Sequence, residues 1–187
     1  MTQSEFEEKV NEYQQLERTR PQLYDIGLKL IQSSYDIEAY LLILATWNFA
    51  HFRYVMKNFD LTRFRETISN VQPIFERLNN KDLMEVRLED ISSDIMSIYS
   101  QLKPIVKQTG ASKLMHFKQP RLFVMWDTAI RAYYHIPQRC TAEDYFNFLG
   151  LMKNCFQNLH WNQHDRTFAK AIDEYNFVVV RNDEEND

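Results

Sequence analysis

The sequence predicts an all-α fold of about nine helices. Gly and Pro, the residues that most often form turns, are scarce: the 187 residues contain three Gly and five Pro. A sheet-rich fold with many hairpins needs more turn formers, whereas long helices joined by short loops do not. Hydrophobic residues make up 44% of the chain and aromatic residues 14%, which is typical of a folded protein with a substantial core. The length fits one domain, residues 1–187.

The first third of the chain predicts three helices. Ser4 and Glu7 match a capping box at the start of the first helix, whose apolar residues recur at helical spacing. Pro21 fits the first turn of a second helix. Asp36 is expected to cap a third helix over residues 37–56, which is apolar on nearly every face. We therefore expect the third helix at the centre of the core.

The middle of the chain predicts shorter helices and a boundary. Residues 61–71 and 73–78 read as two helices, and the polar segment 79–91 reads as turns or a short helix. Two lobes of the fold are expected to meet near 80–90. A further helix begins near Ser92, and Pro104 predicts a kink within it.

The remaining helices are marked by residues that begin or end helices. Thr109-Gly110 is expected to break the preceding helix, since Gly tolerates the positive φ of a helix end. Pro120 stops the next helix, and Asp127 precedes TAIRAYY as an N-cap. Thr141 is expected to cap another helix, and a last helix covers roughly 165–180.

Basic residues are concentrated in one part of the chain. Residues 101–140 contain seven Lys or Arg and one acid, Asp127, which gives a local charge of +6. The net charge of the chain is −4, so the remainder carries −10. This basic part would attract nucleic acid, although an ordinary solvated face explains the same pattern.

Residues 90–135 resemble the helix-hairpin-helix DNA glycosylase superfamily. In that family a Gly-rich hairpin ends in a Thr-Ala-like pair, and a catalytic Asp follows about 16 residues later. Here Gly110-Ala111 stands for the pair, and MWDTAIR places Asp127 sixteen positions after Ala111. The resemblance implies a two-lobed DNA-glycosylase-like helical fold with a helix-hairpin-helix near 95–118.

The resemblance also implies a function. Asp127 would stabilise the positive charge that develops on the sugar when an N-glycosidic bond is hydrolysed. The partner would be DNA, or alternatively RNA or a free nucleoside or nucleotide. Lyase-competent members carry a Lys where this chain has Thr109, so the resemblance favours a monofunctional enzyme that uses water. Lys113 lies one helical turn further on and is the second catalytic candidate, as a nucleophile or as a phosphate contact.

Two further groups of residues follow from this interpretation. A wedge or stacking surface for an extruded base is expected from Trp47, Asn48 and Trp126, and each Trp could equally be a core residue. Backbone and side-chain groups around the hairpin would hold the phosphates. The expected nucleic-acid contacts are Lys107, Thr109, Gly110, Ser112, Lys118, Arg121 and Arg131.

Other classes of protein find less support in the sequence. His160 and His164 with the two Cys residues imitate a zinc-ligand set only loosely, so we expect no metal and no cofactor. The longest apolar run is too short to cross a bilayer, and two Cys make no disulfide framework, so an intracellular protein is expected. A catalytically inactive helical module that binds nucleic acid or another protein remains the alternative.

Overall fold

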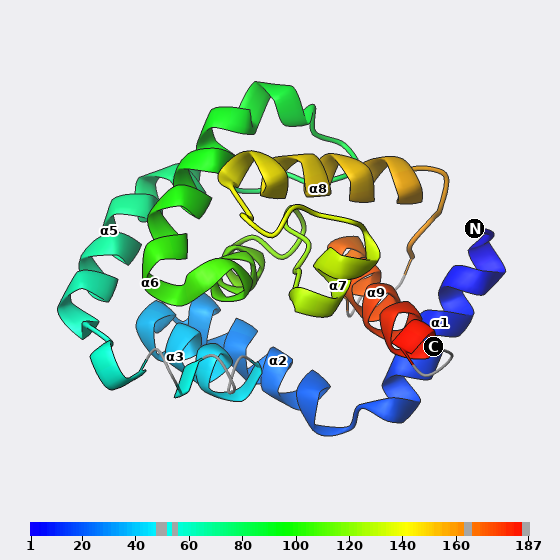
Figure 1. Cartoon of the computed structure of the whole chain (residues 1–187), viewed down its shortest axis with the longest axis horizontal. Helices are drawn as coiled ribbons and strands as arrows, with labels where there is room; N and C mark the ends of the chain where they lie inside the picture. The colour runs from blue at the N-terminus through cyan, green and yellow to red at the C-terminus, as the bar shows by residue number, and fades with distance from the viewer. Residues whose placement is uncertain (48–51, 54–55, 163–165, 185–187) are drawn as a thin grey trace.

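The computed structural model describes residues 1–47, 52–53, 56–162 and 166–184, and this part of the chain contains helices and no strand (Figure 1). The all-α prediction is confirmed, with eight α-helices in the described residues where about nine were expected. The helices are α1 (Gln3–Leu16), α2 (Thr19–Gln32), α3 (Asp36–Trp47), α5 (Leu61–Arg77), α6 (Ser92–Lys118), α7 (Thr128–Tyr133), α8 (Ala142–Phe156) and α9 (Phe168–Glu184), with short 3₁₀ helices at Met56–Asn58 and Leu88–Ile91.

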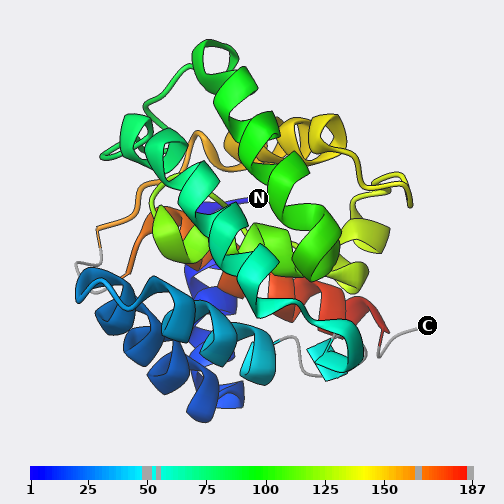
Figure 2. The ribbon, with the colours of Figure 1, turned by 90° about the vertical axis from the view of Figure 1, so that its left-hand side faces the viewer.

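Helix packing joins elements that are far apart in the sequence. α1 lies along α9, so the first and last helices of the described residues are side by side (Figure 1). α2 packs on α3, while α6 contacts both α5 and α8. The view in Figure 2 shows α5 and α6 running next to each other on one side of the molecule. Buried residues from Phe6 to Val180 form a single core cluster that includes residues on both sides of 80–90.

Several helix boundaries differ from the prediction. The capping box of α1 uses Thr2 and Glu5 and not Ser4 and Glu7, because the same residue pattern occurs two positions earlier. Pro73 does not separate two helices but lies inside α5. A single Pro removes one backbone hydrogen bond, and the buried apolar face of α5 is enough to carry the helix past it.

The turn inside α6 also lies elsewhere than predicted. Lys107 has φ 62° and ψ 176°, so α6 consists of two helical segments, Ser92–Val106 and Gln108–Lys118, that run in different directions (Figure 1). Pro104 and Thr109-Gly110 were wrongly expected to make this break. Gly110 has no positive φ and lies buried in the second segment, where a Cβ would come within 2.9 Å of Val106 Cβ. Gly110 is thus required for close packing and not for a turn.

The later boundaries agree better with the sequence. Asp127 caps α7, as predicted, and its carboxylate accepts from the backbone N–H of Ile130. Thr141 caps α8 in a capping box with Asp144. Residues 177–180, which are rich in Val, continue α9 as helix. No helix in the described residues is both long and apolar enough to cross a membrane.

Candidate active site

Lys113 and Asp127 line one pocket of about 120 Å³. The pocket lies where α1, α2, α3, α6, α7 and α9 meet, so its walls come from most of the length of the chain. Its walls combine charged and aromatic side chains. The lining residues are Tyr13, Arg20, Trp47, Lys113, Met125, Trp126, Asp127, Ile130, Asp173 and Phe177.

Lys113 reaches the pocket from the second segment of α6. Its side chain is half-buried, and its ammonium donates a hydrogen bond to the carbonyl oxygen of Trp47 at the end of α3. Burial lowers the pKa of Lys113 to about 8, and the negative charge of Asp127 opposes that shift. A lysine in this state is partly neutral near physiological pH, so its nitrogen lone pair is available to an electrophile.

Asp127 is held at the pocket by the loop that precedes it. Residues 122–126 are at most 2% exposed, which is unusual for a loop and fixes the chain up to the carboxylate. The hydroxyl of Tyr145 on α8 donates to the carbonyl oxygen of Val124, at 2.9 Å. Asp127 Oδ1 then accepts from the backbone N–H of Ile130, at 2.9 Å. The N-cap therefore orients the carboxylate and leaves its second oxygen to other partners.

A two-way hydrogen bond joins the neighbours of these two residues. Ser112 Oγ accepts from the backbone N–H of Trp126, at 3.2 Å, and lies 3.1 Å from the carbonyl oxygen of Trp126 as a donor. Ser112 directly precedes Lys113, and Trp126 directly precedes Asp127. This contact fixes the backbone of the second α6 segment against the loop, and thereby the register of Lys113 relative to Asp127.

Arg131 makes a second connection between the same elements. Its guanidinium donates to Thr109 Oγ1 at 3.2 Å and to Thr128 Oγ1 at 3.1 Å. It also lies over the ring of Trp126, 5.6 Å from the centroid. Arg131 is 7% exposed, so these contacts satisfy a buried cation without a carboxylate partner among them. It therefore holds α7, whose N-cap is Asp127, onto the start of the second α6 segment.

The predicted nucleic-acid contacts are not gathered on one surface. Thr109, Gly110, Ser112 and Arg131 are buried and take part in the packing just described, so they are not placed to contact a phosphate directly. Lys107 is exposed at the turn inside α6. The other two bases form ion pairs, Lys118 with Asp36 at 2.5 Å and Arg121 with Asp82 at 3.1 Å.

The two expected wedge residues that the structure describes, Trp47 and Trp126, differ in burial. Trp47 is half-buried in the pocket wall and stacks on Tyr24, with ring centroids 5.8 Å apart. Trp126 is fully buried, and its Nε1 donates to the carbonyl oxygen of Gln108, at 3.1 Å. Both Trp residues line the pocket, but only Trp47 has part of its side chain exposed there, so stacking on an extruded base is open to Trp47. Asn48 lies outside the described residues.

The sequence interpretation missed the distant walls of the pocket. Tyr13 on α1, Arg20 on α2, and Asp173 and Phe177 on α9 all line it. They belong to no motif, and only the pairing of α1 with α9 brings them near Lys113. The helical spacing of Asp173 and Phe177, one turn apart on an amphipathic helix, was the one signal that they share a face.

The described residues contain no group of three or more side chains that could hold a metal ion. Cys140 and Cys155 are both free thiols. His164, which was considered with them, lies outside the described part of the chain.

Comparison of the chain with protein families, with curated proteins and with solved structures found no match.

Proposed function

We propose that this protein cleaves the N-glycosidic bond of a nucleotide in DNA, with Asp127 and Lys113 as catalytic residues. The observation that supports the proposal best is that Lys113 and Asp127 line one pocket. Residues of these two types in one water-restricted site suit the chemistry at the anomeric carbon, where positive charge develops as the base departs.

The role proposed for Asp127 is electrostatic. As the bond from C1′ to the base nitrogen lengthens, the sugar acquires positive charge, and a carboxylate beside it lowers the barrier. The N-cap contact to Ile130 holds Oδ1 in place at 2.9 Å, so the carboxylate is oriented before substrate binds. Asp127 would also accept the proton that the attacking nucleophile loses.

The nucleophile is either water or Lys113. In the covalent route, the lone pair of the neutral Lys113 amine forms a bond to C1′ while the bond to the base breaks. The base leaves with the bonding electrons and takes up a proton from solvent, and the extra proton on the Lys113 nitrogen passes to Asp127. Burial favours this route, since it lowers the pKa of Lys113 to about 8. In the hydrolytic route, water replaces the amine.

The direct test is incubation with duplex and single-stranded oligonucleotides that carry deaminated, oxidised or alkylated bases. We expect the protein to release at least one of these bases and leave an abasic site that alkali cleaves. In the covalent route, the bond from C1′ to the ring oxygen of the Lys113 adduct then breaks, the nitrogen lone pair forms an imine, and the ring oxygen takes the proton held by Asp127. Water hydrolyses this imine to release the abasic site. Borohydride added during the reaction distinguishes the routes, because it reduces the imine and leaves Lys113 attached to DNA. Free nucleosides form a parallel arm that shows whether a strand is needed.

Two substitutions serve as matched variants. Asp127→Asn keeps an oxygen that can cap α7 but removes the charge, so the fold should persist while base release falls by about 100-fold or more. Lys113→Gln removes the amine and should abolish trapping. Release of no base from any substrate, or base release by Asp127→Asn at the rate of the parent, would refute the proposal. Salt-sensitive DNA binding without product would instead identify a binding module.

A further inference from the structure

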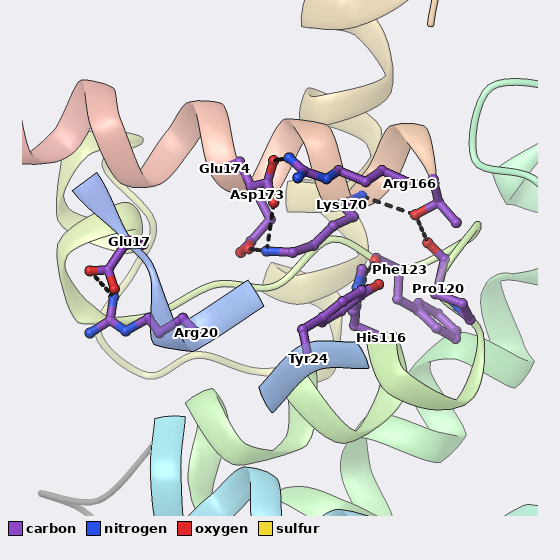
Figure 3. A network of polar contacts seen from close by, with 11 residues as sticks. Glu17, Arg20, Tyr24, His116, Pro120, Phe123, Arg166, Lys170, Asp173 and Glu174 are labelled. Atoms are coloured by element: carbon purple, nitrogen blue, oxygen red, sulfur yellow. Dashed lines mark hydrogen bonds and ion pairs between the residues drawn. The ribbon is translucent and has the colours of Figure 1, made fainter. Parts of the chain in front are cut away.

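Behind the pocket, α9 carries a buried network of charges. Lys170 is 2% exposed, and its ammonium lies 2.9 Å from Asp173 Oδ2 and 3.5 Å from Glu174 Oε1. Arg166, in the segment that precedes α9, extends the network, since its Nη1 lies 2.8 Å from Glu174 Oε2 (Figure 3). α9 and the residues just before it thus bring together two cations and two carboxylates, of which Lys170 and Glu174 are almost fully buried.

Aromatic rings enclose the same ammonium. Lys170 Nζ lies 5.1 Å, 5.0 Å and 5.2 Å from the ring centroids of Tyr13, Tyr24 and Trp47. Cation–π attraction is strongest for such a desolvated cation. Burial alone would lower the pKa of Lys170, but the neighbouring carboxylates, Asp173 first, raise it well above its ordinary value. Lys170 therefore stays charged in the folded protein.

This network meets the pocket through three of its members. Asp173, Tyr13 and Trp47 each contact Lys170 and each line the pocket with Lys113. Buried ion pairs are costly to desolvate and seldom stabilise a fold better than apolar residues of the same volume. Stability alone thus gives no reason for a lysine at this position.

We propose that Lys170 is a positioning residue, whose buried ammonium holds the Asp173 carboxylate and the rings of Tyr13 and Trp47 at the pocket wall, so that Lys113 faces a compensated carboxylate. The inference rests on the proposed role of Lys113. It adds that the Lys170 ammonium, by compensating the Asp173 carboxylate, keeps the Lys113 amine partly neutral. Without Lys170, the uncompensated charge of Asp173 would favour the protonated, non-nucleophilic form of Lys113.

The charged groups around Lys113 act in the direction that this requires. Asp127 and Asp173 raise the pKa of Lys113, whereas Arg20 and Lys170 lower it together with burial. Arg20 is itself held by Glu17, at 3.2 Å, and lies over the ring of Phe177. Lys170 and Asp173 therefore act on the pKa of Lys113 in opposite directions.

The test measures the protonation of Lys113 directly and needs no substrate. Lysines are ¹³C-methylated, and the Lys113 signal is assigned by its loss in Lys113→Arg and followed by NMR against pH. Lys170→Met should raise the pKa of Lys113 by about 0.5 units or more, and Asp173→Asn should lower it by a similar amount. The double variant, which removes both charges, should lie between the two.

Two controls keep the outcome decisive. Lys153→Met removes another half-buried lysine, whose ammonium donates to the Val86 carbonyl, and should leave the Lys113 titration unchanged. Lys170→Arg keeps the charge and should also leave it nearly unchanged, while Asp173→Asn tests the inference even if Lys170→Met does not fold. An unchanged Lys113 titration in folded Lys170→Met and Asp173→Asn would overturn the inference. Shifted titrations without any base release would refute only the proposed function.

Discussion

His116 is a buried histidine whose hydrogen bonds fix it in the neutral form. Its Nδ1 lies 2.5 Å from the carbonyl oxygen of Phe123, which can only accept, so Nδ1 carries the proton. Nε2 then accepts from the hydroxyl of Tyr24, at 2.9 Å (Figure 3). Both ring nitrogens are satisfied without a positive charge, and a second proton would have no acceptor placed for it.

Acid should therefore destabilise the protein through His116. Burial lowers the pKa of His116 from 6.5 to about 4, so between these pH values the unfolded chain binds a proton that the folded protein does not. Stability from this residue is complete above pH 6.5 and falls as the pH drops toward 4, by about 3 kcal/mol in total. Urea unfolding between pH 6.5 and pH 4 measures this change in the free energy of unfolding.

A substitution isolates the contribution of this side chain. His116→Met should be less stable at neutral pH, because it leaves Tyr24 and Phe123 without their partner, but its stability should vary less with acid. His160→Gln, at an exposed position, should keep the parent profile. Equal slopes for the parent and His116→Met would show that another group governs the acid response.

The residue scale also shows how far sequence reasoning reached into the site. The spacing between Gly110-Ala111 and Asp127 identifies the Asp127 carboxylate as a candidate. The position of Lys113, one helical turn after Thr109, identifies the second candidate. Lys170 and Asp173 could not be found in this way. Their roles arise from contacts across α1, α3 and α9, and no local pattern records which distant helix packs where.

At the scale of elements, the helices themselves were largely predictable and their interruptions were not. Helical spacing and caps at Asp127 and Thr141 report interactions within a few residues, which the sequence contains in full. The turn at Lys107 depends instead on how the two segments of α6 pack on their neighbours. Prolines suggested breaks at 73 and 104, but packing carries both helices past them.

The backbone of Lys107 predicts an unusual stabilising substitution. Its φ of 62° with ψ of 176° lies in a region that only Gly occupies without strain. Lys107→Gly should therefore raise the free energy of unfolding by about 1 kcal/mol, after the entropic cost of a Gly in the unfolded chain. Thermal and urea unfolding provide the measurement.

Two control variants accompany Lys107→Gly. Lys107→Ala keeps the strain and should leave stability near that of the parent. Gly110→Ala, three residues on, should destabilise, since the added Cβ would lie 2.9 Å from Val106 Cβ and 3.1 Å from Leu44 Cδ2. A loss of stability in Lys107→Gly would mean that the lysine side chain or its backbone geometry stabilises the turn.

At the scale of the whole molecule, α1 and α9 behave as one unit. α1 packs mainly on α9, and Phe6 and Tyr13 of α1 meet Tyr175 and Phe177 of α9 ring to ring. Because α1 has few other neighbours, its opening should expose α9 as well. The core around α5, α6 and α8 has its own contacts and need not open with them.

Native-state hydrogen exchange tests this coupling. Amides of α1 and of the α1-facing turns of α9 should share one opening free energy, lower than that of α6 and α8. Tyr13→Ala, which removes a buried ring that packs on Phe177 of α9, should accelerate exchange in both by the same factor and leave α8 little changed. Acceleration confined to α1 would show that the two helices open separately.

The pairing of α1 with α9 also determines when the pocket can form during synthesis. The ribosome makes Tyr13 early, Lys113 and Asp127 later, and Asp173 and Phe177 near the end of the sequence, yet all five line one pocket. The core of α5, α6 and α8 can pack while the chain is still growing, because its contacts are already present. The pocket is complete only when α9 packs on α1, so Lys113 and Asp127 are exposed in a nascent chain before the pocket around them has formed.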